Sequence, residues 1–208
     1  EAHNNLGVTL QELGRLDEAE ASLNQAIALK PAFVEAHYNL GITLKELGRL
    51  DGAAASYDKT IALKSDYAEA HNNLGITLQE LGRLEDAEAS CNRAIALKPD
   101  YAEAHSNLGI TLQELGRLDE AEASCRQAIA LKPAFADAHY NLGNTLKELG
   151  RLDKAETSYT QAIALKPDFA EAHSNLGITL QELGRLDEAE ASLNQAIALK
   201  PAFEDAHY

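Results

Sequence analysis

The amino-acid sequence predicts an all-α fold, an α-solenoid of six helix-turn-helix repeats. Two observations support this prediction. Apolar residues recur at helical spacing in two segments of every copy. The sequence also repeats with a period of 34 residues, in copies at 1–34, 35–68, 69–102, 103–136, 137–170 and 171–204, and residues 205–208 begin a seventh copy. Because one helix pair cannot bury its own apolar face, we expect the copies to stack into a single array over residues 1–208.

The first segment of a copy predicts an amphipathic helix near residues 1–13. One apolar arc of this helix holds Ala2, His3, Leu6, Gly7, Leu10 and Leu13. A stripe on the other side holds Glu1, Asn5, Val8 and Glu12. We expect Gly14 to end the helix, because glycine adopts a positive φ without strain.

The second segment predicts a helix that starts near Asp17. We expect the Asp17 side chain to cap free backbone amides, in a pair with Glu20 that resembles a capping box. The apolar stripe of this helix is Ala19, Leu23, Ala26 and Ile27. We expect Pro31 to stop the helix, because proline has no backbone N–H to continue the hydrogen-bond ladder.

Composition and charge exclude several classes of function. The chain has 208 residues, 45% of them apolar, and a net charge of −15, which disfavours binding to nucleic acid or to an anionic membrane. No apolar run approaches the ~20 residues that span a bilayer. With no visible signal peptide and only two cysteines, we expect a cytoplasmic protein. The chain contains no Met, so we do not expect Glu1 to be a natural start.

The repeat resembles the tetratricopeptide repeat over the whole chain. In the first copy the resemblance is carried by Leu6, Gly7, Gly14, Ala19, Ala26 and Pro31. The same pattern recurs in register, with Ser65 in place of the proline in the second copy. The resemblance implies a right-handed superhelix whose first helices line a concave groove. It also implies an interaction scaffold that binds peptides or proteins there, is not an enzyme and needs no cofactor.

Two alternatives to a stand-alone scaffold remain. The Asn-Leu-Gly signature is also similar to the repeats that precede the catalytic domain of O-linked N-acetylglucosamine transferases, whose groove carries a ladder of asparagines. The chain would then be the substrate-recruiting region of a larger transferase, inactive on its own. A designed or consensus-like array is the other reading, because the first and sixth copies differ at only three positions.

The strongest candidate binding residues form one asparagine column on the polar stripe. Its members are Asn5, Asn39, Asn73, Asn107, Asn141 and Asn175. A primary amide has two N–H donors and an acceptor, so such a column could hold an extended peptide backbone whatever its side chains. The alternative is that each asparagine only orients neighbouring helices through local hydrogen bonds.

Positions that vary between copies on the same stripe are the candidates for ligand specificity. They are Tyr38 and Tyr140 in one column, and Ile42, Ile76, Ile110 and Asn144 in another. The alternative for the isoleucines is packing against the next copy. Two acidic columns border the stripe, one beginning at Glu1 and one at Glu12. If both face the groove, we expect a neutral or basic partner; the alternative is a solvated face.

The histidines and the two cysteines are expected to have structural rather than catalytic or metal-binding roles. The histidines occupy one column at repeat spacing, ~10 Å apart, too far for shared metal ligation. Cys91 and Cys125 are also one period apart, and we expect them to be buried hydrophobes. Since no capping helix follows residues 205–208, we expect copies of the chain to stack end to end.

Overall fold

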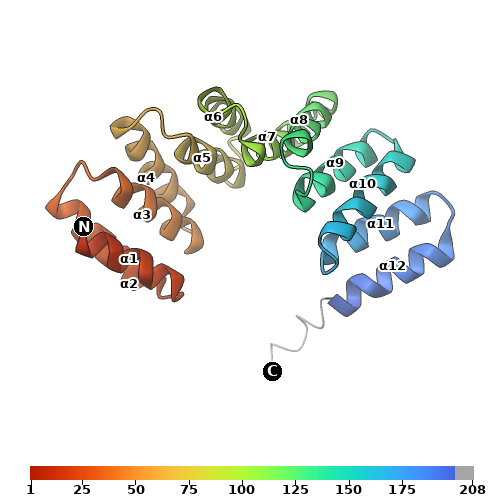
Figure 1. The fold of residues 1–208 in the computed structure, drawn as a ribbon, viewed down its shortest axis with the longest axis horizontal. Coiled ribbons are helices and arrows are strands. Elements are labelled where there is room, and N and C mark those ends of the chain that lie inside the picture. Colours follow the sequence, from red (N-terminus) through yellow and green to blue (C-terminus); the bar gives the residue numbers. More distant parts are fainter. Residues whose placement is uncertain (200–208) are drawn as a thin grey trace. The chain divides into compact units, whose positions relative to one another are not determined.

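In the computed structural model the chain is all-α. The structure describes residues 1–199, and within them it contains twelve α-helices and no β-strand (Figure 1). The expected seventh copy at residues 205–208 lies outside the described residues.

The helices alternate between the first and the second helix of each copy. The first helices are α1 (Ala2–Glu12), α3 (Val34–Glu46), α5 (Ala68–Glu80), α7 (Ala102–Glu114), α9 (Ala136–Glu148) and α11 (Ala170–Glu182). The second helices are α2 (Leu16–Leu29), α4 (Leu50–Leu63), α6 (Leu84–Leu97), α8 (Leu118–Leu131), α10 (Leu152–Leu165) and α12 (Leu186–Leu199). The predicted helix-turn-helix repeat is therefore present six times in the described residues.

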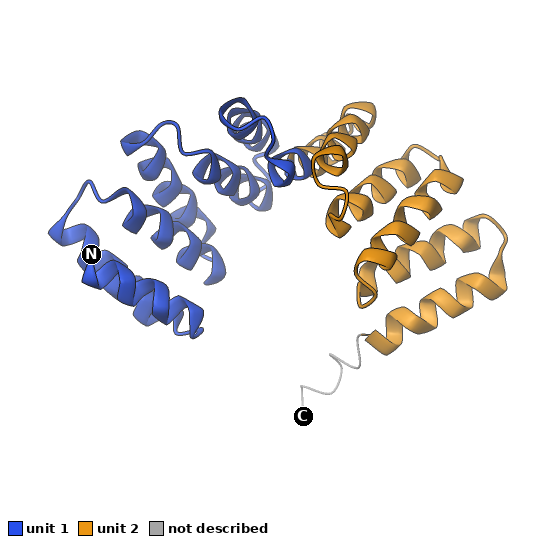
Figure 2. Ribbon diagram, viewed as in Figure 1, with its two compact units in different colours: residues 1–107 blue, residues 108–208 orange. Residues whose placement is uncertain are grey.

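The chain forms two compact units, residues 1–107 and residues 108–208, whose boundary falls within α7 (Figure 2). In unit 1 the hairpins α1–α2, α3–α4 and α5–α6 stack in order, and α1 and α3 each also contact the first helix of the next hairpin. In unit 2 the hairpins α9–α10 and α11–α12 stack in the same way, and α8 packs on α9. Packing of neighbouring hairpins within each unit confirms the α-solenoid architecture.

Glycine ends the first helix of each repeat, as expected. Gly14 has a φ of +72°, and the amides of Gly14 and Arg15 donate to the carbonyls of Gln11 and Leu10. These two bonds form a Schellman motif, which satisfies carbonyls at the helix end. The same pair of bonds recurs after each first helix.

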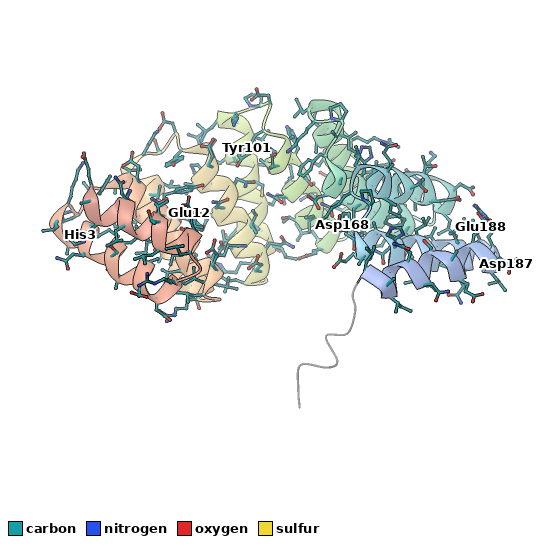
Figure 3. The ribbon with its side chains drawn as sticks, turned by 60° about the horizontal axis from the view of Figure 1, so that its bottom comes forward. His3, Glu12, Tyr101, Asp168, Asp187 and Glu188 are labelled. Atoms are coloured by element: carbon teal, nitrogen blue, oxygen red, sulfur yellow. The ribbon has the colours of Figure 1, made fainter. Side chains whose placement is uncertain are left out.

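The second helix starts near Asp17, as expected, but the expected side-chain cap was wrong. Helix α2 begins at Leu16, with Arg15 at the N-cap, and no side chain caps it. Asp17 therefore lies inside the first turn, where its negative charge interacts favourably with the positive end of the helix dipole. Figure 3 shows Asp187, the equivalent of Asp17, and the adjacent Glu188 at the start of α12.

The second helix stops without needing a proline. Helix α2 ends at Leu29 before Pro31, and α4 ends at the equivalent Leu63 although Ser65 replaces the proline. After each second helix from α2 to α10, a lysine ammonium lies over the aromatic ring three residues later, at 4.5–4.8 Å from the ring centroid. The connection to the next repeat is thus held by its own side chains as well as by proline.

Close approach of the two helices in a hairpin depends on glycine. A Cβ on Gly41 would lie 2.6 Å from the ring of Tyr57, and one on Gly143 would lie 2.5 Å from the ring of Tyr159. Both tyrosines are almost fully buried. The first and second helices therefore meet with no room for a larger residue at these positions.

Candidate functional site

The asparagine column has one member at the equivalent position of each first helix, and its members differ in exposure. Asn5 is exposed, Asn141 is 9% exposed, and the others are half-buried. In unit 1 the column runs over α1, α3, α5 and α7, and in unit 2 it runs over α9 and α11. The residues are therefore only partly available to a ligand, and their hydrogen bonds decide what remains.

Four asparagine bonds to a neighbouring repeat share one spacing, 35 residues. The Nδ2 of Asn39 donates to Asn4 Oδ1 at 3.0 Å, and the Nδ2 of Asn107 donates to Asn72 Oδ1 at 2.9 Å. The acceptor stands 35 residues earlier, one position before the preceding member of the column. The local role considered for the column is thus present: its amides link neighbouring helices.

Tyrosine replaces asparagine as the acceptor at two places. Asn73 Nδ2 donates to Tyr38 OH at 3.1 Å, and Asn175 Nδ2 donates to Tyr140 OH at 3.1 Å. Both tyrosines are half-buried, and the Tyr38 ring stacks on Tyr67 with centroids 4.9 Å apart. Tyr38 and Tyr140 therefore lie between repeats, with their hydroxyls bonded to the asparagine column.

A second row of contacts lies two turns along the same helices. Lys45 Nζ lies 2.9 Å from Glu80, and Lys147 Nζ lies 3.6 Å from Glu182. At the alternate repeats, Gln11 donates to Glu46 and Gln113 donates to Glu148, again across 35 residues. Glu12, which begins this acidic column, stands at the end of α1 (Figure 3).

The isoleucine column lies between these two rows. Ile42, Ile76 and Ile110 are all half-buried, and Ile42 packs against the core cluster of unit 1. Packing, the alternative role, is therefore present for Ile42, and contact of the isoleucines with a ligand stays a prediction. Asn144 occupies this column in the fifth repeat and is also half-buried.

Asn144 joins two tyrosines and an asparagine in one network. Its Oδ1 accepts from Tyr159 OH and from Asn175 Nδ2, each at 2.9 Å. Tyr159 is fully buried, and burial raises the pKa of its hydroxyl, so the phenol stays protonated and donates. In unit 1, burial likewise raises the pKa of the equivalent Tyr57.

Two surface hollows of unit 2 include members of the asparagine column. One, of about 490 Å³, is lined by Gln113, Asn144, Lys147, Glu148, Tyr159, Asn175 and Glu182. We call it the amide pocket. A second, of about 380 Å³, is lined by Tyr140, Ala170, Glu171, Ser174, Asn175, Ala196 and Ile197. The amide pocket brings together Asn144 and Asn175, two of the residues expected from the sequence.

The sequence places Gln113 and Lys147 in a third variable column of the same stripe, but it did not single out Tyr159 as a neighbour of the site. One signal was available: the second-helix tyrosines Tyr57 and Tyr159 occur only in the copies that also carry Tyr38 and Tyr140. The centroids of the paired rings lie 6.0 Å apart in both copies. This co-occurrence therefore indicates direct contact between the two columns.

The histidines support the chain connections. From the second repeat on, the Nε2–H of each histidine in the described residues donates to the carbonyl six residues earlier, at 2.9–3.2 Å. The described residues contain no cluster of His, Cys, Asp or Glu that could hold a metal. The expected member of the column at His207 lies outside the described residues.

Apolar side chains are exposed at the first and last repeats of the described part. Leu6 is 51% exposed and Leu13 64%, whereas the equivalent of Leu6 in the second repeat, Leu40, is 8% exposed. Leu186 and Ile197 are exposed in α12. End-to-end stacking of copies through such surfaces stays a prediction.

Within residues 1–199, no helix has the length and apolar character needed to cross a membrane.

Models of the tetratricopeptide repeat match almost the whole chain. One TPR repeat model matches residues 10–48, 43–82 and 143–184. Three further tetratricopeptide repeat models match residues 66–134, 112–158 and 170–203. The fold and these matches define a helical repeat protein. The chain belongs to the tetratricopeptide repeat family.

Solved structures of the same architecture agree with this assignment. A crystal structure of MamA is 30% identical, with a TM-score of 0.67, covering 77% of this chain and 94% of its own. PilF of Pseudomonas aeruginosa is 21% identical, with a TM-score of 0.82 and coverage of 97% and 91%. YrrB, described as a TPR protein with an unusual peptide-binding site, is 23% identical, with a TM-score of 0.64 and coverage of 87% and 93%.

A search of curated proteins found no significant match. The family and the similar structures place the chain among protein-interaction scaffolds, and they point to a repeat protein without catalytic activity.

Proposed function

We propose that the chain binds an extended segment of a partner protein along the face that carries the asparagine column. The observation that supports this most is the direction of the inter-repeat bonds. Because Asn39 and Asn175 use Nδ2 as donor to the preceding repeat, each amide plane is held in place. The Oδ1 of each then remains as an acceptor for a peptide N–H.

The spacing of the column suits an extended ligand. Neighbouring helices pack ~8–10 Å apart. Three residues of an extended peptide cover ~9–10 Å. One backbone N–H in every third residue of the ligand can therefore meet one asparagine per repeat, so binding depends on the backbone more than on side chains.

The charge of this face selects against acidic ligands. Lysines pair with Glu80 and Glu182 in the second row, whereas Glu46 and Glu148 are paired with neutral glutamines. The whole chain carries a net charge of −15. A neutral or basic segment would be attracted and an acidic one repelled, with an effect that decreases as salt is added.

The test compares the column with its structural partners. Fifteen-residue linear peptides selected by phage display on the intact protein provide the probe. Replacing Asn73 and Asn107 together by Ala removes two column amides, and we expect a loss of affinity of ~10-fold or more in calorimetric titration. The matched control is Asn72→Ala, which removes the buried acceptor of Asn107 but keeps the column amides.

An equal loss of affinity in the Asn72→Ala control would show that the column acts only by orienting helices. Unchanged affinity in the double variant would also contradict the proposal. The alternative of a substrate-recruiting region stays a hypothesis. A sugar-nucleotide-binding domain encoded in the same gene would favour it.

A further inference from the structure

In the amide pocket, two side-chain amides together keep both hydrogen-bond donors and an acceptor that no other described residue uses. Asn144 Oδ1 already accepts from Tyr159 OH and from Asn175 Nδ2. Asn175 Nδ2 uses both of its N–H groups, on Tyr140 OH and on Asn144 Oδ1. Among the described residues, this leaves the two N–H groups of Asn144 and the Oδ1 of Asn175 for a ligand.

The two amides are bonded to each other at the pocket. The Nδ2 of Asn175 donates to Asn144 Oδ1 at 2.9 Å, and both residues line the amide pocket. Tyr159, which is fully buried, also donates to Asn144 Oδ1. The lining thus includes one amide with unused N–H donors and one with an unused acceptor.

We propose that the amide pocket binds a side-chain carboxamide, that of Gln or Asn, on the peptide that occupies the asparagine column. This inference rests on the proposed function, since the column places the peptide. The carboxamide oxygen accepts from Asn144 Nδ2, and the carboxamide nitrogen donates to Asn175 Oδ1, whose second lone pair remains for the backbone N–H. The pocket volume of about 490 Å³ accommodates such a group.

The remaining lining groups disfavour the other side-chain classes. Glu148 and Glu182 border the pocket and repel a carboxylate, and Lys147 is already paired with Glu182. An ammonium group offers only donors, so it would leave the Asn144 N–H groups without an acceptor. An aliphatic side chain would cover both amides without forming hydrogen bonds to them. Burial of unpaired polar groups costs free energy, so such a side chain would bind weakly.

Unit 1 contains the same arrangement with one difference. Tyr38, Lys45, Tyr57, Asn73 and Glu80 stand where unit 2 has Tyr140, Lys147, Tyr159, Asn175 and Glu182. Ile42 occupies the place of Asn144. The donor half of the pair is therefore missing from unit 1, and the chain supplies its own matched control for the contribution of Asn144.

The experiment uses blocked five-residue peptides on the intact protein. The probes are acetyl-Ser-Gly-Xaa-Gly-Ser-amide, with Gln, Glu, Lys or Leu as Xaa. Binding is followed through the side-chain amide signals of the asparagines in nitrogen-15 correlation spectra. We expect the Gln peptide to bind ~10-fold more tightly than the Glu and Leu peptides and to shift the Asn144 and Asn175 signals.

Two reciprocal variants test the assignment. Asn144→Ile should remove the preference for Gln, and Ile42→Asn should add a second Gln-preferring site, reported by the Asn73 signals. Each variant introduces a residue that the chain already carries at the equivalent position, so folding should be kept, as unchanged helical circular dichroism would verify.

The outcomes separate the pocket from the proposed function. If all four peptides shift the column signals equally and Asn144→Ile has no effect, the pocket proposal is wrong while backbone binding stands. A preference for the Lys peptide that survives Asn144→Ile would also overturn the pocket proposal, because Glu148 and Glu182, rather than the two amides, would then determine which peptide binds. If no peptide shifts any signal of the column, both proposals fail.

Discussion

The side-chain amide of Asn175 donates to the hydroxyl of Tyr140, 3.1 Å away in the preceding repeat. This bond joins the asparagine column to the packing between repeats, and Asn73 makes the same bond to Tyr38 in unit 1. The residues that we propose as ligand contacts are therefore also the residues that hold neighbouring repeats in register. Stability and binding should respond together to changes at this junction.

Tyr140→Phe should destabilise the protein by ~1 kcal/mol, because it leaves one N–H of Asn175 without its acceptor while keeping the ring packing on Phe169. The measurement is the free energy of unfolding in urea. Tyr67→Phe is the matched control, since the position equivalent to 67 is filled by Phe in four of the other copies. Equal stability of Tyr140→Phe and the native protein would show that the bond contributes nothing.

Two Gly→Ala replacements in one hairpin should act in opposite directions. Gly41→Ala places a Cβ 2.6 Å from the buried Tyr57 ring and should cost ~1–3 kcal/mol. Gly52→Ala meets only the flexible end of Leu44, at 3.3 Å, and should gain up to ~1 kcal/mol from higher helix propensity. Thermal and urea unfolding measure both effects. Destabilisation of similar size at both positions would contradict the close packing described for α3 and α4.

The two thiols should be unreactive in the folded protein. Burial raises the pKa of Cys91 and of Cys125 to about 12, so at pH 8 almost no thiolate is present. We expect Ellman's reagent to label both thiols only at the rate of unfolding, and immediately in urea. Rapid labelling of the native protein would contradict their burial.

The sign of the linkage follows from the same shift. Because the pKa of these thiols is higher in the folded than in the unfolded chain, their contribution to stability is complete below pH ~8.5 and is lost as the pH rises toward 12. Alkaline unfolding should therefore begin in this window.

Acid should weaken the protein through His71. Burial lowers the pKa of this imidazole, whose Nε2–H donates to the Ser65 carbonyl. Its contribution to stability is therefore present above pH ~6.5 and is lost as the pH falls through the lowered pKa. In an NMR titration, we expect His71 to protonate below pH 6.5. His71→Tyr should reduce the slope of stability against pH, and an unchanged slope would exclude His71 as the cause.

Much of the fold could be predicted from the sequence because the determinants are local. Gly14 ends α1 wherever it recurs, since its positive φ completes two backbone hydrogen bonds. The cap on α2 could not be predicted, because the same turn places Arg15 at the N-cap and moves Asp17 into the helix. A pattern of Asp and Glu does not reveal which residue the preceding turn leaves at the cap.

The position of the asparagine column on the first helices could be predicted from the sequence, but its contacts could not. A helical wheel places Asn4 and Asn72 on the polar side, yet they are only 8% and 3% exposed. The reason is that a first helix packs on the next first helix as well as on its own partner. Which side chains meet across that second contact depends on the offset between helices, which a single-helix projection does not contain.

The central claim is that the asparagine column accepts hydrogen bonds from a peptide backbone. The most direct test is a crystal structure of the protein with a peptide selected by phage display. We predict an extended peptide whose backbone N–H groups donate to the Oδ1 atoms of Asn39 and Asn175. A peptide seated against the second helices, with the asparagine amides untouched, would contradict the claim.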